Sequence, residues 1–140
     1  MARVLVDTGA VVALVNRADR YHQASVDWFR SFRGTLLTTE AVITETAYVL
    51  TASAAHQHAA LVWFERARSA GLLAVEPESN YAALAAIITR YASLPCDYAD
   101  ATLIALAERT GVASIATIDQ RDFSVYRIRG RKRFRILLAA

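Results

Sequence analysis

Residues 3–15, RVLVDTGAVVALV, join a short apolar segment to an apolar helix-forming segment, with a carboxylate at the junction. Residues 4–6 are aliphatic and β-branched, as in a buried strand, and residues 10–15 favour a helix. Strands followed directly by helices are typical of α/β domains with a parallel sheet. Ligands bind beyond the carboxyl ends of such strands, which is where Asp7 is expected.

The same alternation continues along the chain. Further strands are expected at residues 36–37, 72–75, 114–118 and 134–138. Helices are expected at residues 21–32, from 39 through 54, at 58–70, 79–92 and 97–110. Asp97 can cap the last of these helices and Gly111 can end it. We therefore predict a helix-rich α/β domain with a largely parallel sheet.

Length and composition favour one ordinary domain. The chain has 140 residues, of which 55% are hydrophobic and 21% charged, which predicts a single domain over residues 1–140. Cys96 is the one cysteine, so no internal disulfide forms and a reducing compartment is expected. The longest apolar run, residues 82–88, is far short of the roughly 20 residues that a membrane span needs. We expect a soluble, cytoplasmic protein without a membrane partner.

The net charge of +3 conceals two unlike segments. Residues 1–119 carry 9 basic and 12 acidic side chains, whereas residues 120–140 carry 7 basic and one acidic side chain. A basic end predicts contact with a polyanion. The candidate contacts to RNA phosphates are Arg127, Arg129, Arg131, Lys132 and Arg133. Alternation of Arg133 with Arg135 is equally typical of a charged edge strand that resists aggregation.

Several carboxylates fall where a parallel sheet would present them. Asp7 and Asp119 each directly follow a predicted strand, and Glu45 lies at the flank of an apolar helical stripe. Asp97 and Asp100 are three residues apart and so share one helix face. Each acid also has a purely structural explanation, because aspartate is common in turns and as a helix N-cap. That explanation accounts for Asp97 better than for Asp100, which precedes an apolar face.

Carboxylates that converge on one place need a cation or bound protons to offset their mutual repulsion, which a single carboxylate does not need. They repel one another, and some stay protonated near neutrality unless a cation joins them. A set of oxygen ligands without histidine or thiolate selects Mg²⁺ or Mn²⁺ over Zn²⁺. Such an ion can activate a water molecule and orient it towards a phosphodiester.

Other chemistries fit the chain poorly. It has no glycine-rich phosphate loop, and Lys132 is its one lysine. The sequence VDTGA is also typical of aspartic-protease loops, but those domains are all-β and leave the other acids without a role. A phosphotransferase of the haloacid-dehalogenase type expects a second aspartate where this chain has Gly9.

Four segments in order resemble a PIN domain of the VapC type, the ribonuclease toxin of bacterial toxin–antitoxin pairs. They are VLVDTGAVVAL at residues 4–14, ITETAYVL at 43–50, YADATLIALAERTG at 98–111 and IATIDQRDFSVYRIRGRKRF at 115–134. The resemblance covers nearly the whole chain. It implies a PIN-like three-layer α/β/α sandwich with a short, mainly parallel central sheet.

The resemblance also assigns roles to residues. It implies that Asp7, Glu45, Asp100 and Asp119 are the catalytic acids, with Asp7 and Asp100 bearing most directly on the metal. It implies that the hydroxyls of Thr8 and Thr117 help to order the site, and that Asp97 and Asp122 are accompanying acids. The family often has serine where this chain has Thr8, so the hydroxyl is kept.

The implied activity is Mg²⁺- or Mn²⁺-dependent endonucleolytic cleavage of RNA by a homodimer. A cognate antitoxin would inhibit it, typically by placing a C-terminal segment with an arginine in the acidic groove. A PIN scaffold that binds RNA or a protein without cutting is the alternative. Such scaffolds usually lack one or more of the acids, and this chain has all four.

Overall fold

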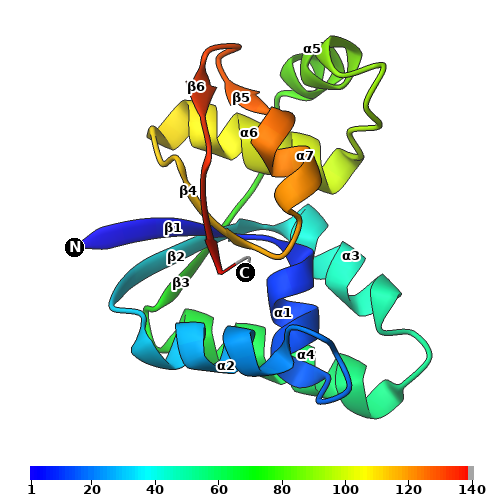
Figure 1. The fold of residues 1–140 in the computed structure, drawn as a ribbon, viewed down its shortest axis with the longest axis vertical. Helices are drawn as coiled ribbons and strands as arrows, with labels where there is room; N and C mark the ends of the chain where they lie inside the picture. Colours follow the sequence, from blue (N-terminus) through cyan, green and yellow to red (C-terminus); the bar gives the residue numbers. More distant parts are fainter. Residues whose placement is uncertain (139–140) are drawn as a thin grey trace.

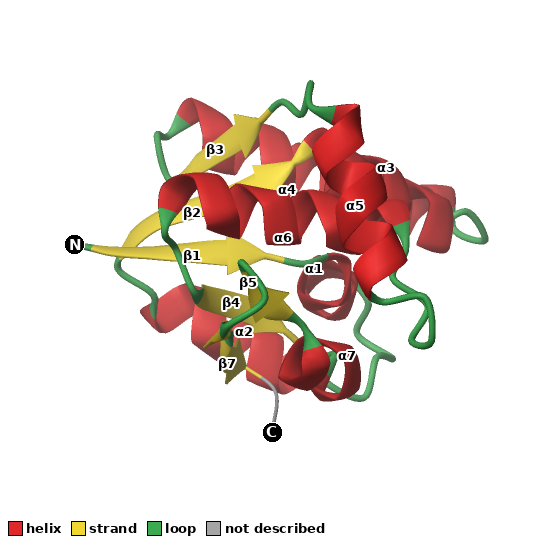
Figure 2. Cartoon of the chain, turned by 90° about the horizontal axis from the view of Figure 1, so that it is seen from above, coloured by secondary structure: helices red, strands yellow, loops and turns green. Residues whose placement is uncertain are grey.

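The computed structural model describes residues 1–138 and has a five-stranded parallel sheet at its centre (Figure 1). The strand order is β3-β2-β1-β4-β7, and every neighbouring pair is parallel (Figure 2). The strands are β1 (Ala2–Val6), β2 (Gly34–Thr39), β3 (Leu73–Glu76), β4 (Ser114–Thr117) and β7 (Arg135–Leu138). Because all five run the same way, their carboxyl ends meet at one edge.

Helices cover both faces of the sheet, with α5, α6 and α7 above it and α1, α2 and α4 below it in Figure 1. The helices are α1 (Thr8–Val15), α2 (His22–Ser31), α3 (Glu40–Val49), α4 (Ala54–Ser69), α5 (Tyr81–Arg90), α6 (Tyr98–Thr110) and α7 (Gln120–Val125). This confirms the predicted α/β/α sandwich and excludes the all-β fold of an aspartic protease.

Two hydrophobic cores follow from the alternation of side chains along each strand. On β1, Leu5 packs into a core with α5, α6 and α7, whereas Val4 and Val6 pack into a second core with α1 and α4. Helix α6 is buried along most of its length because it lies directly on the sheet. Its N-cap is Asp97 and its C-cap is Gly111 at φ 75°, as predicted.

The predicted helix from residue 39 through 54 is wrong, because two helices share this range. Helix α3 ends at Val49, and the Thr51 hydroxyl bonds back to the carbonyl of Tyr48. Helix α4 then starts at Ala54, where the Ser53 side chain accepts the amide hydrogen of His56. Hydroxyl side chains that bond to nearby backbone groups compete with a continuous helix.

The segment between β4 and β7 contains structure that the sequence did not indicate. Helix α7 comes first, and a two-stranded antiparallel hairpin follows, formed by β5 (Arg127–Ile128) and β6 (Lys132–Arg133). Arg133 therefore lies in this hairpin, while Arg135 opens β7 at the edge of the main sheet. The interpretation of Arg133 and Arg135 as alternating residues of one edge strand is wrong.

Within residues 1–138, none of the helices combines the length and the apolar character needed to cross a membrane.

Candidate active site

The predicted acids gather at the carboxyl edge of the sheet. Asp7 follows β1 and Asp119 follows β4, while Asp100 comes from the first turn of α6 and Glu45 from the middle of α3. Asp7 and Asp100 are buried, with 6% and 8% of their surfaces exposed. Glu45 and Asp119 are partly exposed. Carboxylates from four separate segments thus surround one small region.

Two of these acids, Asp7 and Asp119, and the neighbouring Asp97 also cap helices, so the structural explanation of each of the three is correct as well. Asp7 Oδ1 accepts the amide hydrogen of Thr8 (2.8 Å) at the start of α1. Asp97 accepts that of Asp100 (2.8 Å) in α6. Asp119 accepts that of Asp122 (2.9 Å) in α7. Capping therefore fixes where these carboxylates stand, and it brings three helix N-termini to the same region.

Hydroxyl groups hold three of the carboxylates. Thr117 Oγ1 donates to Asp7 Oδ2 (2.8 Å) and also accepts the amide hydrogen of Asp119 (2.9 Å). Thr8 Oγ1 donates to Glu45 Oε1 (2.5 Å). The structure thus places both threonines beside the acids, as the predicted ordering role requires.

The third donor was not predicted. The buried phenol of Tyr126 donates to Asp100 Oδ2 (2.8 Å) from a position 26 residues further along the chain. A tyrosine between the strands expected at residues 114–118 and 134–138 carries no sequence signal for such a contact.

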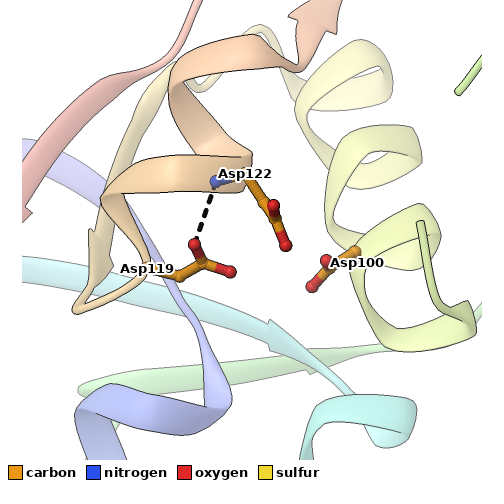
Figure 3. Close-up of side chains that lie close together, drawn as sticks. All are labelled: Asp100, Asp119 and Asp122. Atoms are coloured by element: carbon orange, nitrogen blue, oxygen red, sulfur yellow. Dashed lines mark hydrogen bonds between the residues drawn. The ribbon is translucent and has the colours of Figure 1, made fainter. Parts of the chain in front are cut away.

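Asp100, Asp119 and Asp122 each present one carboxylate oxygen such that these atoms all lie within 4.8 Å of one another (Figure 3). Asp122, predicted to be only an accompanying acid, therefore belongs to the cluster. The three side chains come from α6, the β4–α7 junction and α7. Clustered carboxylate oxygens are the ligands that hard divalent cations prefer.

Burial and mutual repulsion shift the acids towards their protonated forms. Burial, together with the nearby charges of Asp7 and Asp97, raises the pKa of Asp100 to about 8 despite the Tyr126 hydrogen bond. Burial raises the pKa of Asp7 to about 6. It also raises the pKa of Glu45 to about 7, with Asp97 adding to the effect. In residues 1–138 the ion pairs all lie elsewhere, so no arginine or lysine neutralises these carboxylates by direct contact.

Gly9 has a packing role next to the site. A Cβ atom at this position would lie 2.6 Å from Cγ1 of Ile118, the residue that precedes Asp119. Glycine thus allows the first turn of α1 to pack closely against the β4–α7 junction.

Three of the basic candidates, Arg129, Arg131 and Lys132, lie at the opposite end of α6 from Asp100. Arg127 caps the carbonyls of residues 124–126, and Arg129 donates to the carbonyl of Glu108. The side chains of the remaining candidates are exposed, namely Arg131, Lys132 and Arg133. Arg129, Arg131 and Lys132 line a cavity of about 440 Å³ beside the last turn of α6. The eight residues from Asp100 to Glu108 correspond to about 12 Å of helix, so the structure does not bring these residues into the acidic site.

The fold and the site together define an α/β/α domain with a cluster of carboxylates at the carboxyl edge of a parallel sheet. Residues 4–128 match the family model of the PIN domain, and the chain belongs to this family.

Two mycobacterial proteins are similar to the chain. Ribonuclease VapC26 of Mycobacterium tuberculosis (strain ATCC 25618 / H37Rv) is 28% identical over 134 residues, which cover 96% of this chain and 99% of the relative. The crystal structure of Mycobacterium tuberculosis VapC20, a Sarcin-Ricin loop cleaving toxin, superposes with a TM-score of 0.69 at 22% identity. That match covers 80% of this chain and 86% of VapC20, and it supports the fold.

Proposed function

We propose that this single-domain protein is a metal-dependent endoribonuclease that acts as the toxin of a toxin–antitoxin pair. The observation that carries the proposal is the set of buried or half-buried carboxylates that form no ion pair with any basic side chain of the described residues. Membership of the PIN family and full-length similarity to a ribonuclease support it. The acids predicted from the sequence, Asp7, Glu45, Asp100 and Asp119, are the proposed catalytic residues.

The donor set fits Mg²⁺ or Mn²⁺, because every candidate ligand is a carboxylate oxygen. Asp100, Asp119 and Asp122 would hold the ion, with Asp7 beside them. When bound, the ion would acidify a water molecule and stabilise the leaving oxygen of a phosphodiester.

The chain's own groups would hold and move protons around this centre. Thr117 and Tyr126 fix the carboxylates of Asp7 and Asp100 by donating hydrogen bonds. Glu45 changes protonation near neutrality, since its pKa is raised to about 7, and Thr8 holds one of its oxygens. A carboxylate with these properties is suited to take a proton from an attacking water.

The proposed partners are an RNA substrate and an antitoxin. A carboxylate cluster that pairs with no basic side chain of residues 1–138 suits an arginine supplied by the antitoxin. Exposed residues of the hairpin, Arg131, Lys132 and Arg133, are the proposed contacts to RNA phosphates. The side chains of Arg127 and Arg129 already donate hydrogen bonds to backbone carbonyls of the protein, so we expect them to add positive charge rather than direct contacts to RNA.

Homodimerisation is part of the proposal, and exposed aromatic side chains support it. Tyr48 and Tyr81 expose 78% and 65% of their surfaces, and Tyr98 exposes 48%. Tyr98 lines one cavity with Tyr48 and a second cavity with Tyr81, so the three side chains are neighbours. Adjoining exposed apolar groups are typical of surfaces that another chain covers.

The deciding experiment is cleavage of total cellular RNA by the wild-type protein in the presence of Mg²⁺, in EDTA, and by Asp100→Asn in the presence of Mg²⁺. Discrete fragments that require both the metal and Asp100 are the expected result. Asp27→Asn, which changes an exposed aspartate on α2, is the matched control and should cut normally. Intact RNA with folded, Mn²⁺-binding wild-type protein would favour the PIN scaffold that binds without cutting.

A further inference from the structure

We propose that Tyr126 is a positioning residue that orients Asp100 towards the cation site. This inference rests on the proposed metal-dependent function and adds a member to the site that lies outside the predicted acids and threonines. Its basis is the 2.8 Å hydrogen bond from the phenol to Asp100 Oδ2.

The phenol ring has almost no freedom to move. Tyr126 has no exposed surface, and its ring contacts those of Phe123 and Tyr91 edge to face, with centroids 5.1 Å and 4.9 Å apart. A donor that is immobilised in this way favours one orientation of its acceptor, because any other orientation leaves the buried hydroxyl only the neighbouring Cys96 thiol, which is a weak partner. The rigid ring thus determines where the carboxylate of Asp100 points.

One short segment carries both the donor and two of the clustered acids. Asp119 is the N-cap of α7, Asp122 lies in its first turn, and Tyr126 is its C-cap, where its amide donates to the carbonyl of Asp122. The hydrogen bond from Tyr126 therefore joins the α7 half of the cluster to Asp100 on α6. Separate elements that must hold one ion need such a connection, because ligand positions are set by the groups behind them.

The three hydroxyl contacts form a consistent pattern. Asp7 has Thr117, Glu45 has Thr8, and Asp100 has Tyr126. Each hydroxyl occupies one carboxylate oxygen and leaves the other for a further contact. Within residues 1–138 the carboxylate of Asp100 accepts one hydrogen bond, from Tyr126, so this phenol directs its orientation.

The first test is titration of the metal-free full-length protein with Mn²⁺ by calorimetry. Tyr126→Phe should weaken Mn²⁺ binding by about 10- to 100-fold, the usual effect of removing a group that supports a metal ligand. Tyr91→Phe is the matched control, because it removes a hydroxyl from the same aromatic cluster whose partner is the backbone of Arg127. Its Mn²⁺ affinity should stay within about twofold of wild type. Equal affinities for Tyr126→Phe and Tyr91→Phe would overturn the proposal.

RNA cleavage separates positioning from loss of packing. For Tyr126→Phe, the Mn²⁺ concentration that gives half-maximal rate should rise by the same factor as Kd, and the rate should approach that of wild type at saturating Mn²⁺. A rate that falls without any change in the Mn²⁺ requirement would overturn the proposal. If wild type binds Mn²⁺ but leaves RNA intact, the proposed function fails while the binding comparison still decides the role of Tyr126.

A double-mutant cycle on the metal-free protein tests the contact without activity. Tyr126→Phe should lower Tm in the wild-type background and should lower it by less than half as much in Asp100→Ala, which has no acceptor. Additive effects of the two substitutions on Tm would show that the hydroxyl does not act through Asp100, and would overturn the proposal.

Discussion

The two ends of helix α6 illustrate two different uses of charge. At its first turn, Asp97 and Asp100 belong to a group of carboxylates that backbone amides and hydroxyls hold in fixed positions. At its last turn, Arg131 and Lys132 line an open cavity, and their side chains make no hydrogen bond or ion pair with residues 1–138. Fixed and buried like charges destabilise the protein until a cation arrives, whereas exposed charges act at long range and are screened by salt.

The largest expected effect comes from neutralising one fixed carboxylate. Asp100→Asn should abolish RNA cleavage and raise the Tm of the metal-free protein, because it removes a charge that burial and Asp7 both disfavour. Its amide oxygen can still accept the Tyr126 hydroxyl. Asp7→Asn should also abolish cleavage but should raise Tm less, since Asp7 accepts hydrogen bonds on both oxygens and an amide has only one. Unchanged cleavage by both variants would remove these acids from the site.

The next largest expected effect is a pH dependence of stability that arises from the acids around the first turn of α6. The pKa values of Asp7, Glu45 and Asp100 are raised to about 6, 7 and 8, so the folded protein binds more protons than the unfolded chain above about pH 4. The metal-free protein should therefore lose stability as pH rises from about 4 to 8. Thermal unfolding in EDTA across this range measures the decline, which should be smaller for Asp100→Asn. Saturating Mn²⁺ should also reduce it, and a Tm that rises with pH in EDTA would contradict the assignment.

A smaller effect, on the free energy of unfolding, is expected from overpacking the contact between Gly9 and Ile118 beside the acids. Gly9→Ala should destabilise the protein by about 1–3 kcal/mol, the range for overpacking a filled site, because the new methyl group would meet Ile118. Denaturant unfolding of Gly9→Ala, Ile118→Ala and the double variant checks this. The double variant should be more stable than the sum of the two single effects implies, and strict additivity would show that the two residues do not compete for space.

The smallest effect on stability is expected from substitutions of the exposed basic residues beside the last turn of α6. Changing Arg131 and Lys132 together to alanine should leave the Tm nearly unchanged and weaken RNA binding. The slope of log K against log salt should fall by about 1.4 for two lost contacts to a single strand. Arg17→Ala with Arg66→Ala removes the same charge from exposed positions elsewhere and serves as the control. An identical salt slope in both double variants would show that the hairpin does not contact RNA.

The sequence predicted those parts of the site that local rules determine. Asp7 and Asp119 follow strands, and the carboxyl ends of parallel strands meet, so their proximity could be expected. The three-residue spacing of Asp97 and Asp100 placed both at one helix start. Glu45 carried only a weak local signal, and its assignment came from the family resemblance. These residues now lie together, while their catalytic roles stay predictions.

Other features depended on packing between distant segments. Nothing about Tyr126 in the sequence indicates that its hydroxyl meets Asp100 from across the domain. Helix α7 is only six residues long, too short for a periodic pattern to show, so the family resemblance alone indicated that Asp122 accompanies the other acids. The turn at Arg129 and Gly130, both at positive φ, folds the basic segment into a hairpin whose tip lies beside the last turn of α6.

Helix capping by the acids determines which substitutions should remove activity without disturbing the fold. Asp7, Asp97 and Asp119 each cap the start of a helix, so replacing any of them by a residue that cannot cap disturbs local folding together with chemistry. Asp100 and Glu45 cap nothing, and each accepts a single side-chain hydroxyl that an amide can also accept. Asp100→Asn and Glu45→Gln are therefore the forms of choice for trapping an uncut RNA or for co-expression without an inhibitor.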